Sequence, residues 1–129
     1  MKKSYFIFPF LFLSLLSCSR GILGDAEDTI GLERREVLFA SGKDSIELRT
    51  TKGDDWWLSS ISTSDTTYIN HSVKDIIMEG GGLYVKKTGR KSIFIRVESN
   101  KTGMERRFSI VIQAGNYFNS IEIRQKTGD

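Results

Sequence analysis

The stretch from Ser92 to Gln125 most constrains the fold, because apolar residues recur in it at every second position. These positions are Ile93, Ile95 and Val97, then Phe108, Ile110 and Ile112, then Ile121 and Ile123. A period of two is typical of β-strands that bury one face. The three runs are separated by Asn100–Gly103 and by Gly115-Asn116, residue types that favour tight turns. The stretch therefore predicts three consecutive antiparallel strands.

Shorter runs of β-forming residues precede this stretch. They predict strands over residues 37–40, 45–51, 56–61, 67–70 and 83–87. Residues 71–82 break the pattern and are expected to form a long loop, with a helical turn or a strand hairpin as alternatives. Seven to eight short strands and no long helical segment predict an all-β, immunoglobulin-like β-sandwich of antiparallel strands.

The N-terminus has the pattern of a secretory signal peptide. Lys2 and Lys3 precede an apolar run from Tyr5 to Leu16, which is shorter than the roughly 20 residues that cross a bilayer. The run ends in the sequence LLSC at residues 15–18, which resembles the lipobox of bacterial lipoproteins. That resemblance implies cleavage before Cys18, a diacylglyceryl thioether on its sulfur and an acyl chain, such as palmitate, on its new amine. The alternative is an ordinary secretory signal with an incidental cysteine.

Lipidation of Cys18 would remove the only thiol of the chain, which excludes a disulfide or a zinc–thiolate site. Loss of residues 1–17 removes two lysines and no acidic residue, so the net charge falls from +3 to +1. This balance offers no basic patch for nucleic acid. We expect a lipoprotein signal peptide over residues 1–17, the lipidated cysteine and a flexible tether over 18–35, and the sandwich over 36–126.

Four short motifs resemble the BACON domain, named as Bacteroidetes-associated carbohydrate-binding, often N-terminal. They are Phe39–Gly42, the Trp56-Trp57 strand, Asn100–Arg106 and the closing Ile121–Gln125. The resemblance covers about residues 35–126. It implies an immunoglobulin-like sandwich on a lipoprotein of a Bacteroidetes-type envelope, with carbohydrate or mucin as the ligand. In the family, many copies look like spacers.

Exposed aromatic residues are the candidate ligand-binding residues. Trp56 and Trp57 are adjacent in a strand, so they point to opposite faces. Leu58 shares a face with Trp56, which favours Trp56 in the core, whereas Ile61 shares a face with Trp57 and favours the reverse.

Sugar rings present flat C–H faces that stack on aromatic rings. Trp57, Tyr84 and Tyr117 are therefore the three candidates, and packing is the alternative role of each.

Nothing in the sequence predicts catalysis, a metal site or a cofactor. His71 is the only histidine, and no G-x-S-x-G motif is present. Arg106 is expected to be structural, either capping turn carbonyls or pairing with Glu105 or Glu98.

The two resemblances together imply a non-catalytic lipoprotein anchored by lipid in the outer membrane, which binds a glycan or mucin through exposed aromatics. The alternative is a structural spacer, or a protein-interaction accessory subunit of an envelope complex. Surface export in this lineage is associated with acidic residues just after the lipidated cysteine, whereas Ser19-Arg20-Gly21 follow here. The surface and periplasmic faces therefore both remain open.

Overall fold

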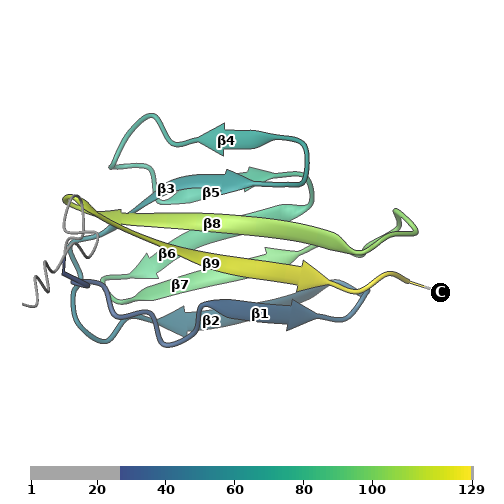
Figure 1. The fold of residues 1–129 in the computed structure, drawn as a ribbon, viewed down its shortest axis with the longest axis horizontal. Helices are drawn as coiled ribbons and strands as arrows, with labels where there is room; N and C mark the ends of the chain where they lie inside the picture. The colour runs from purple at the N-terminus through teal and green to yellow at the C-terminus, as the bar shows by residue number, and fades with distance from the viewer. Residues whose placement is uncertain (1–26, 129) are drawn as a thin grey trace, which may run out of the picture.

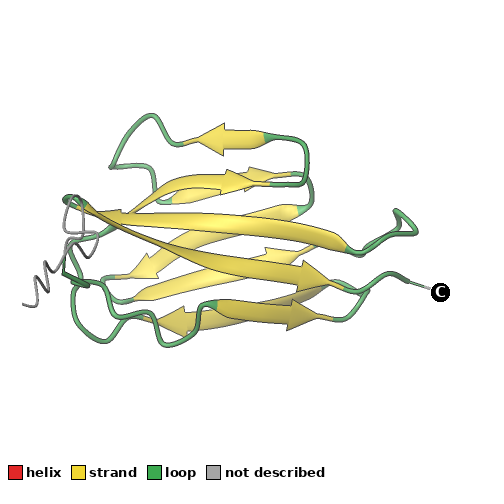
Figure 2. Cartoon of the chain, in the orientation of Figure 1, coloured by secondary structure: helices red, strands yellow, loops and turns green. Residues whose placement is uncertain are grey.

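Nine strands form two β-sheets in a computed structural model, which describes residues 27–128 (Figures 1 and 2). The strands are β1 (Glu36–Phe39), β2 (Asp44–Arg49), β3 (Trp57–Ser62), β4 (Thr67–Ile69), β5 (Ile77–Gly80), β6 (Leu83–Gly89), β7 (Ser92–Val97), β8 (Arg106–Ala114) and β9 (Tyr117–Gln125). Within residues 27–128 there is no helix long and apolar enough to cross a membrane.

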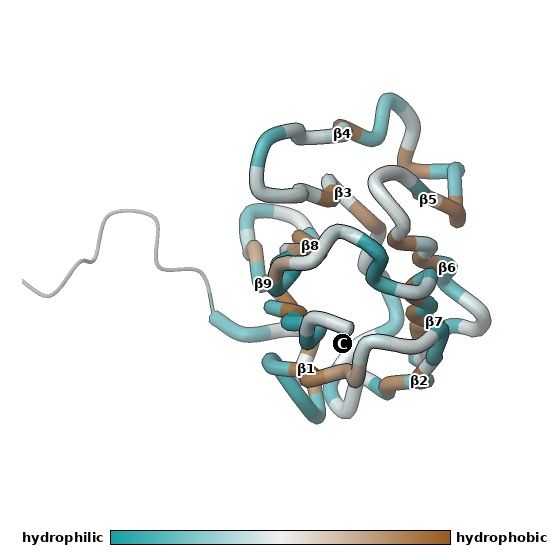
Figure 3. Tube along the Cα trace, turned by 90° about the vertical axis from the view of Figure 1, so that its right-hand side faces the viewer, coloured by the Kyte–Doolittle hydropathy of each residue, from teal (hydrophilic) through white to brown (hydrophobic). Residues whose placement is uncertain are grey.

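The two sheets lie face to face, as the end-on view in Figure 3 shows. One sheet has the strand order β1-β9-β8-β3-β4 and the other has the order β2-β7-β6-β5. Every pair is antiparallel except β1 and β9, which run parallel, with Val37 opposite Ile123. The prediction of an all-β sandwich is confirmed, whereas the expectation of purely antiparallel strands is wrong for β1.

The segment expected as a long loop contains β5, so its strand-hairpin alternative is the one that forms. Met78 pairs with Val85, and Gly81 and Gly82 make the turn between β5 and β6. Both glycines have positive φ, of 62° and 91°, a conformation that side chains disfavour. These glycines therefore form a tight hairpin turn.

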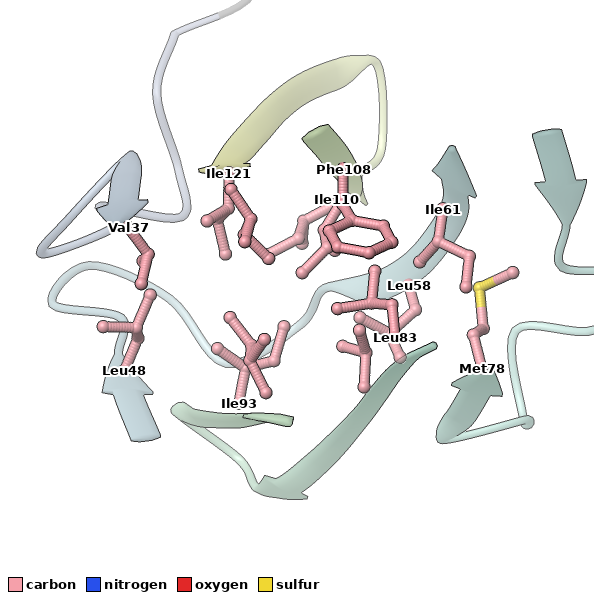
Figure 4. Close-up of a cluster of buried hydrophobic side chains, with 14 of the residues drawn as sticks. Val37, Leu48, Leu58, Ile61, Met78, Leu83, Ile93, Phe108, Ile110 and Ile121 are labelled. Carbon is pink, nitrogen blue, oxygen red and sulfur yellow. The ribbon is translucent and has the colours of Figure 1, made fainter. Parts of the chain in front are cut away.

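The core lies between the sheets and is built from the inward residues of both. Figure 4 shows Leu58 and Ile110 of one sheet meeting Leu83 and Ile93 of the other, and all four are buried. The predicted alternation holds along β7, β8 and β9, where every second residue is buried. Burial of a residue of this size contributes about 1.5–3 kcal/mol, so these strands carry much of the stability.

A β-bulge in β3 settles which tryptophan is internal. Leu58 lies opposite Ile112 and Ser60 lies opposite Val111, so one extra residue stands between the two pairs. The bulge resets the alternation, and Leu58 and Ile61 both point into the core. The patterns with Leu58 and with Ile61 therefore no longer conflict, and Trp56 is the buried tryptophan.

The folded domain begins before residue 36, so the predicted tether is too long. Ile30 is fully buried in the core, and Leu32 forms a β-bridge with Thr50. The Asp28 carboxylate accepts hydrogen bonds from the backbone N–H groups of Ile30 and Gly31, at 3.0 and 2.9 Å. Residues 1–26, which include the predicted signal peptide and Cys18, lie outside the described residues.

The free edges of the two sheets meet where the Tyr68 ring of β4 packs on the backbone of Gly80 in β5. A Cβ atom at Gly80 would lie 2.5 Å from the ring carbons of Tyr68. Gly80→Ala is therefore expected to lower the free energy of unfolding by about 1–3 kcal/mol through this overlap. Urea denaturation measures the effect.

Gly42→Ala is the matched control, because nothing lies within 4 Å of the added Cβ. It should change stability by less than about 0.5 kcal/mol. In a Tyr68→Ala background the cost of Gly80→Ala should disappear, since the ring is absent. An equal cost in both backgrounds would refute the steric explanation.

Candidate functional site

Three of the four family-like motifs, all but Trp56-Trp57, come together in one polar cluster at the end of the sandwich. The side chain of Gln125, at the end of β9, is fully buried. Its Oε1 accepts hydrogen bonds from Nε and Nη2 of Arg106, at 3.1 and 2.7 Å. Its Nε2 donates to the carbonyl oxygens of Ser41, Gly42 and Glu98, at 3.3, 3.2 and 3.0 Å.

Asn100 extends this cluster through the loop before β8. Its Nδ2 donates to the carbonyl oxygens of Met104 and Lys126, at 2.7 and 3.0 Å. Its Oδ1 accepts from the N–H and the hydroxyl of Thr102, at 3.1 and 2.6 Å. The polar groups of this cluster form hydrogen bonds with one another, so the motifs hold chain segments in position. Few hydrogen-bond donors or acceptors remain for a ligand.

Arg106 has the structural role that its position predicted. It caps backbone carbonyls, since it donates to the carbonyl oxygens of Glu98 at 2.7 Å and Gly81 at 3.4 Å. Burial lowers the pKa of Arg106, and the carboxylate of Glu98 opposes that shift. Glu105 instead pairs with Arg124, whose hydrogen bond lowers the pKa of Glu105.

An aromatic platform, formed by Trp57, Gln113 and Phe118, lies on the outer face of the five-stranded sheet. The register places Trp57 opposite Gln113, and Gln113 opposite Phe118. Neighbouring strands are about 4.8 Å apart, so the two aromatic backbones are separated by about 10 Å. Phe118 is 56% exposed and Trp57 is half-buried. The platform therefore offers two aromatic side chains with an amide between them.

The next row of the same face has short side chains. It consists of Ser120, Val111, Ser60 and Ile69, taken from β9 across to β4. In the third row the hydroxyl of Ser109 donates to Oε1 of Glu122 at 2.9 Å. Arg34 and Arg35 line a pocket together with Ser120, so charged side chains border the second row at its β9 end.

The structure does not bring the three predicted aromatics together. Trp57 lies on the platform, whereas Tyr84 lies on the outer face of the other sheet. There the Arg96 guanidinium is 4.3 Å from the Tyr84 ring centre, and the Phe94 ring packs edge-on at 6.2 Å. Tyr84 and Trp57 therefore share no surface.

Tyr117 is not an exposed aromatic, because it packs against the core. Burial, and to a lesser extent the negative charge of the Asp28 carboxylate, raise the pKa of Tyr117. Its neighbour Phe118 has the exposed position. When the alternation of Ile121 and Ile123 is continued back along β9, it places Tyr117 inside and Phe118 outside. The sequence therefore did contain the information that Phe118 is the outward residue.

No group of three or more potential metal-ligating side chains occurs among residues 27–128. His71 lies exposed in the loop between β4 and β5.

Comparison with solved structures identifies the type of sandwich. An NMR structure of a protein from Bacteroides thetaiotaomicron matches with a TM-score of 0.69 and 19% identity, over 87% of this chain and 98% of that chain. The titin M3 domain matches with a TM-score of 0.50 and 7% identity, over 76% of this chain and 95% of that domain. The fold is immunoglobulin-like. No family model and no curated protein sequence matches the chain.

Proposed function

We propose that this chain is a BACON-type envelope lipoprotein that binds carbohydrate through Trp57 and Phe118. The observation that carries the proposal is the row on the outer sheet face, where Gln113 separates the two aromatics. Aromatic faces stack on the C–H faces of sugar rings, and an amide supplies both a donor and an acceptor for sugar hydroxyls. Strands hold these groups in fixed positions, so little order is lost on binding.

The ligand class follows from the surface around the platform. The adjoining row is short and uncharged, so a chain of sugars has room to lie flat on it. A neutral glycan suits this surface, because charges of both signs border it: Glu122 and Glu36 stand opposite each other in the third row, and Arg34 and Arg35 line the pocket beside Ser120. The proposal includes no catalytic step and no cofactor.

Trp57→Ala and Phe118→Ala are each expected to weaken glycan binding about tenfold, because each removes one stacking partner. A glycan array identifies the ligand, and titration calorimetry with the full chain measures its affinity for each variant. Tyr84→Ala is the matched control, since it removes a half-buried aromatic from the opposite sheet. Equal losses for all three variants, or a loss for Tyr84→Ala alone, would contradict the platform.

The proposed membrane anchor is lipid on Cys18. Cys18→Ser is expected to move the protein from the membrane fraction to the soluble fraction and to abolish incorporation of labelled palmitate. The physical reason is that two or more acyl chains give a stable anchor, at about 0.8 kcal/mol per buried CH₂. Fractionation and labelling of cells check both effects, and membrane retention of the variant would overturn the proposal.

A protein-interaction role is the second candidate, favoured by exposed apolar residues around the β4–β5 edge. Ile69, Val73 and Ile77 are exposed there, and neither β4 nor β5 pairs with a further strand. A photo-crosslinker at Val73 in intact cells tests this role. A discrete crosslinked protein together with an empty glycan array would favour it over carbohydrate binding.

A further inference from the structure

A cleft lies among turns at one end of the sandwich. The β3–β4 and β5–β6 turns lie at the end opposite residue 27 (Figure 1). Three segments form the cleft, namely the β3–β4 turn over residues 63–66, Gly81 in the β5–β6 turn, and the start of β8 with the loop before it. Its volume is about 480 Å³. Small-molecule sites have volumes of about 300–1,000 Å³, so the cleft has the size for a small ring.

Part of the cleft wall is apolar. Tyr68 lines it from β4, and Met104 has 72% of its surface exposed there. Phe108 of β8 contributes little surface, because it is 3% exposed and the Arg106 guanidinium lies 5.4 Å from its ring centre. An exposed methionine next to aromatic side chains offers a soft apolar surface. One face of a bound ring would therefore meet apolar groups.

The rim has two polar groups with unused hydrogen-bonding capacity. Asp65 accepts a bond from the Thr63 hydroxyl on Oδ1, at 2.9 Å, and its second oxygen has no partner among the described residues. Arg107 is 72% exposed, and its nearest carboxylate, that of Glu105, is 4.0 Å away and hydrogen-bonded to Arg124. A carboxylate acceptor and a forked donor of opposite charge suit vicinal hydroxyls and give no preference for an ion.

The loops around the cleft are held in place before any ligand arrives. The N–H of Thr66 donates to the Thr63 hydroxyl at 3.1 Å, which closes the β3–β4 turn. A Cβ at Gly81 would lie 2.5 Å from the Thr63 methyl group, so the two turns pack directly on each other. Asn100 fixes the third segment through its bonds to Thr102 and Met104.

The cleft is continuous with the aromatic platform. The outward residues of β8 run from Gln113 through Val111 and Ser109 to Arg107 at the rim. Six residues of strand span about 20 Å. A chain of sugars that stacks on the platform therefore has a path of short side chains to the cleft.

We infer that the cleft is a second binding site, which takes one neutral polyhydroxylated ring at the end of the glycan. The ligand class rests on the proposed function, whereas the location rests on Asp65, Arg107 and the apolar part of the wall. The glycan would lie along β8, with internal rings on Trp57 and Phe118 and its terminal ring in the cleft.

The test is NMR titration of the full chain, labelled with ¹⁵N, with glucose, galactose, mannose, xylose and N-acetylglucosamine, each added separately. At least one sugar is expected to cause saturable shifts of the amides of residues 63–66, 81 and 102–107. Asp65→Ala and Arg107→Ala should each abolish these shifts. Asp75→Ala, which removes a carboxylate from the opposite end, should leave them unchanged.

The outcomes separate this inference from the proposed function. Shifts confined to the amides around Trp57 and Phe118 would overturn the cleft and leave the platform standing. Cleft shifts that persist in Trp57→Ala would support the cleft even where the platform fails. Absence of saturable cleft shifts with all five sugars, in a protein whose melting temperature is normal, would overturn the inference.

Discussion

Replacing Gln125 with leucine is expected to lower the free energy of unfolding by about 3–5 kcal/mol, because several polar groups lose their hydrogen-bond partner at about 1–3 kcal/mol each. Leucine keeps much of the side-chain volume but removes the amide. Two donors of Arg106 lose their acceptor, and the carbonyl oxygens of Ser41, Gly42 and Glu98 lose a donor. The site is fully buried, so water cannot replace these bonds without opening the end of the sandwich. Chemical denaturation measures the loss.

Gln113→Leu is the matched control, because Gln113 is the outward glutamine of the adjacent strand. Its Nε2 makes one exposed hydrogen bond, to the carbonyl oxygen of Gly115 at 3.0 Å. We expect a change of less than about 1 kcal/mol. Similar losses for the two variants would mean that the buried cluster contributes no more than a surface bond.

Trp56→Ala is expected to cost about 3–5 kcal/mol, and Trp57→Ala much less, although the residues are adjacent. Trp56 is 2% exposed, and its indole N–H donates to the hydroxyl of Thr50 at 3.2 Å. The ammonium of Lys87 lies 4.1 Å from the ring centre and donates to the carbonyl oxygen of Trp56 at 2.6 Å. Removal of the indole therefore leaves a cavity and exposes a partly desolvated cation, whose pKa burial already lowers.

Fluorescence of the phenylalanine variants assigns the two environments independently of stability. Trp57→Phe should retain the blue emission of Trp56 and lose most of the quenching by iodide. Trp56→Phe should show the reverse. Equal quenching of both variants would contradict the inward and outward positions that the β-bulge imposes.

The alternating residues of β7, β8 and β9 made the sandwich predictable, because one buried face leaves a period of two in the sequence. The bulge between Leu58 and Ser60 left no such mark, since its extra residue is visible only against the partner strand β8. The parallel pairing of β1 with β9 was also invisible, because it joins residues more than 80 positions apart. Local pattern predicted the strands, whereas their pairing is a property of the whole chain.

The candidate site was predictable to a similar extent. Residue type and alternation point to Trp57. They point to Tyr117 in place of Phe118 only when the alternation of Ile121 and Ile123 is not extended back to the start of β9. Tyr84 alternates with the buried residues Leu83 and Val85 and so points outward, but its strand belongs to the other sheet. The cleft was not predicted, since its walls come from turns about 40 residues apart in the sequence.

The parallel pairing of β1 and β9 determines when the domain becomes complete. Antiparallel hairpins such as β6–β7 and β8–β9 close over a few residues and form early, whereas β1 must wait for nearly the whole chain. Until then Val37, Phe39 and Ile30 have no core to enter, and the edge of β9 is unpaired. Because the chain is synthesised from its N-terminus, β1 is the strand that stays accessible to chaperones and proteases longest. Its pairing with β9 then closes the sandwich in a single late step.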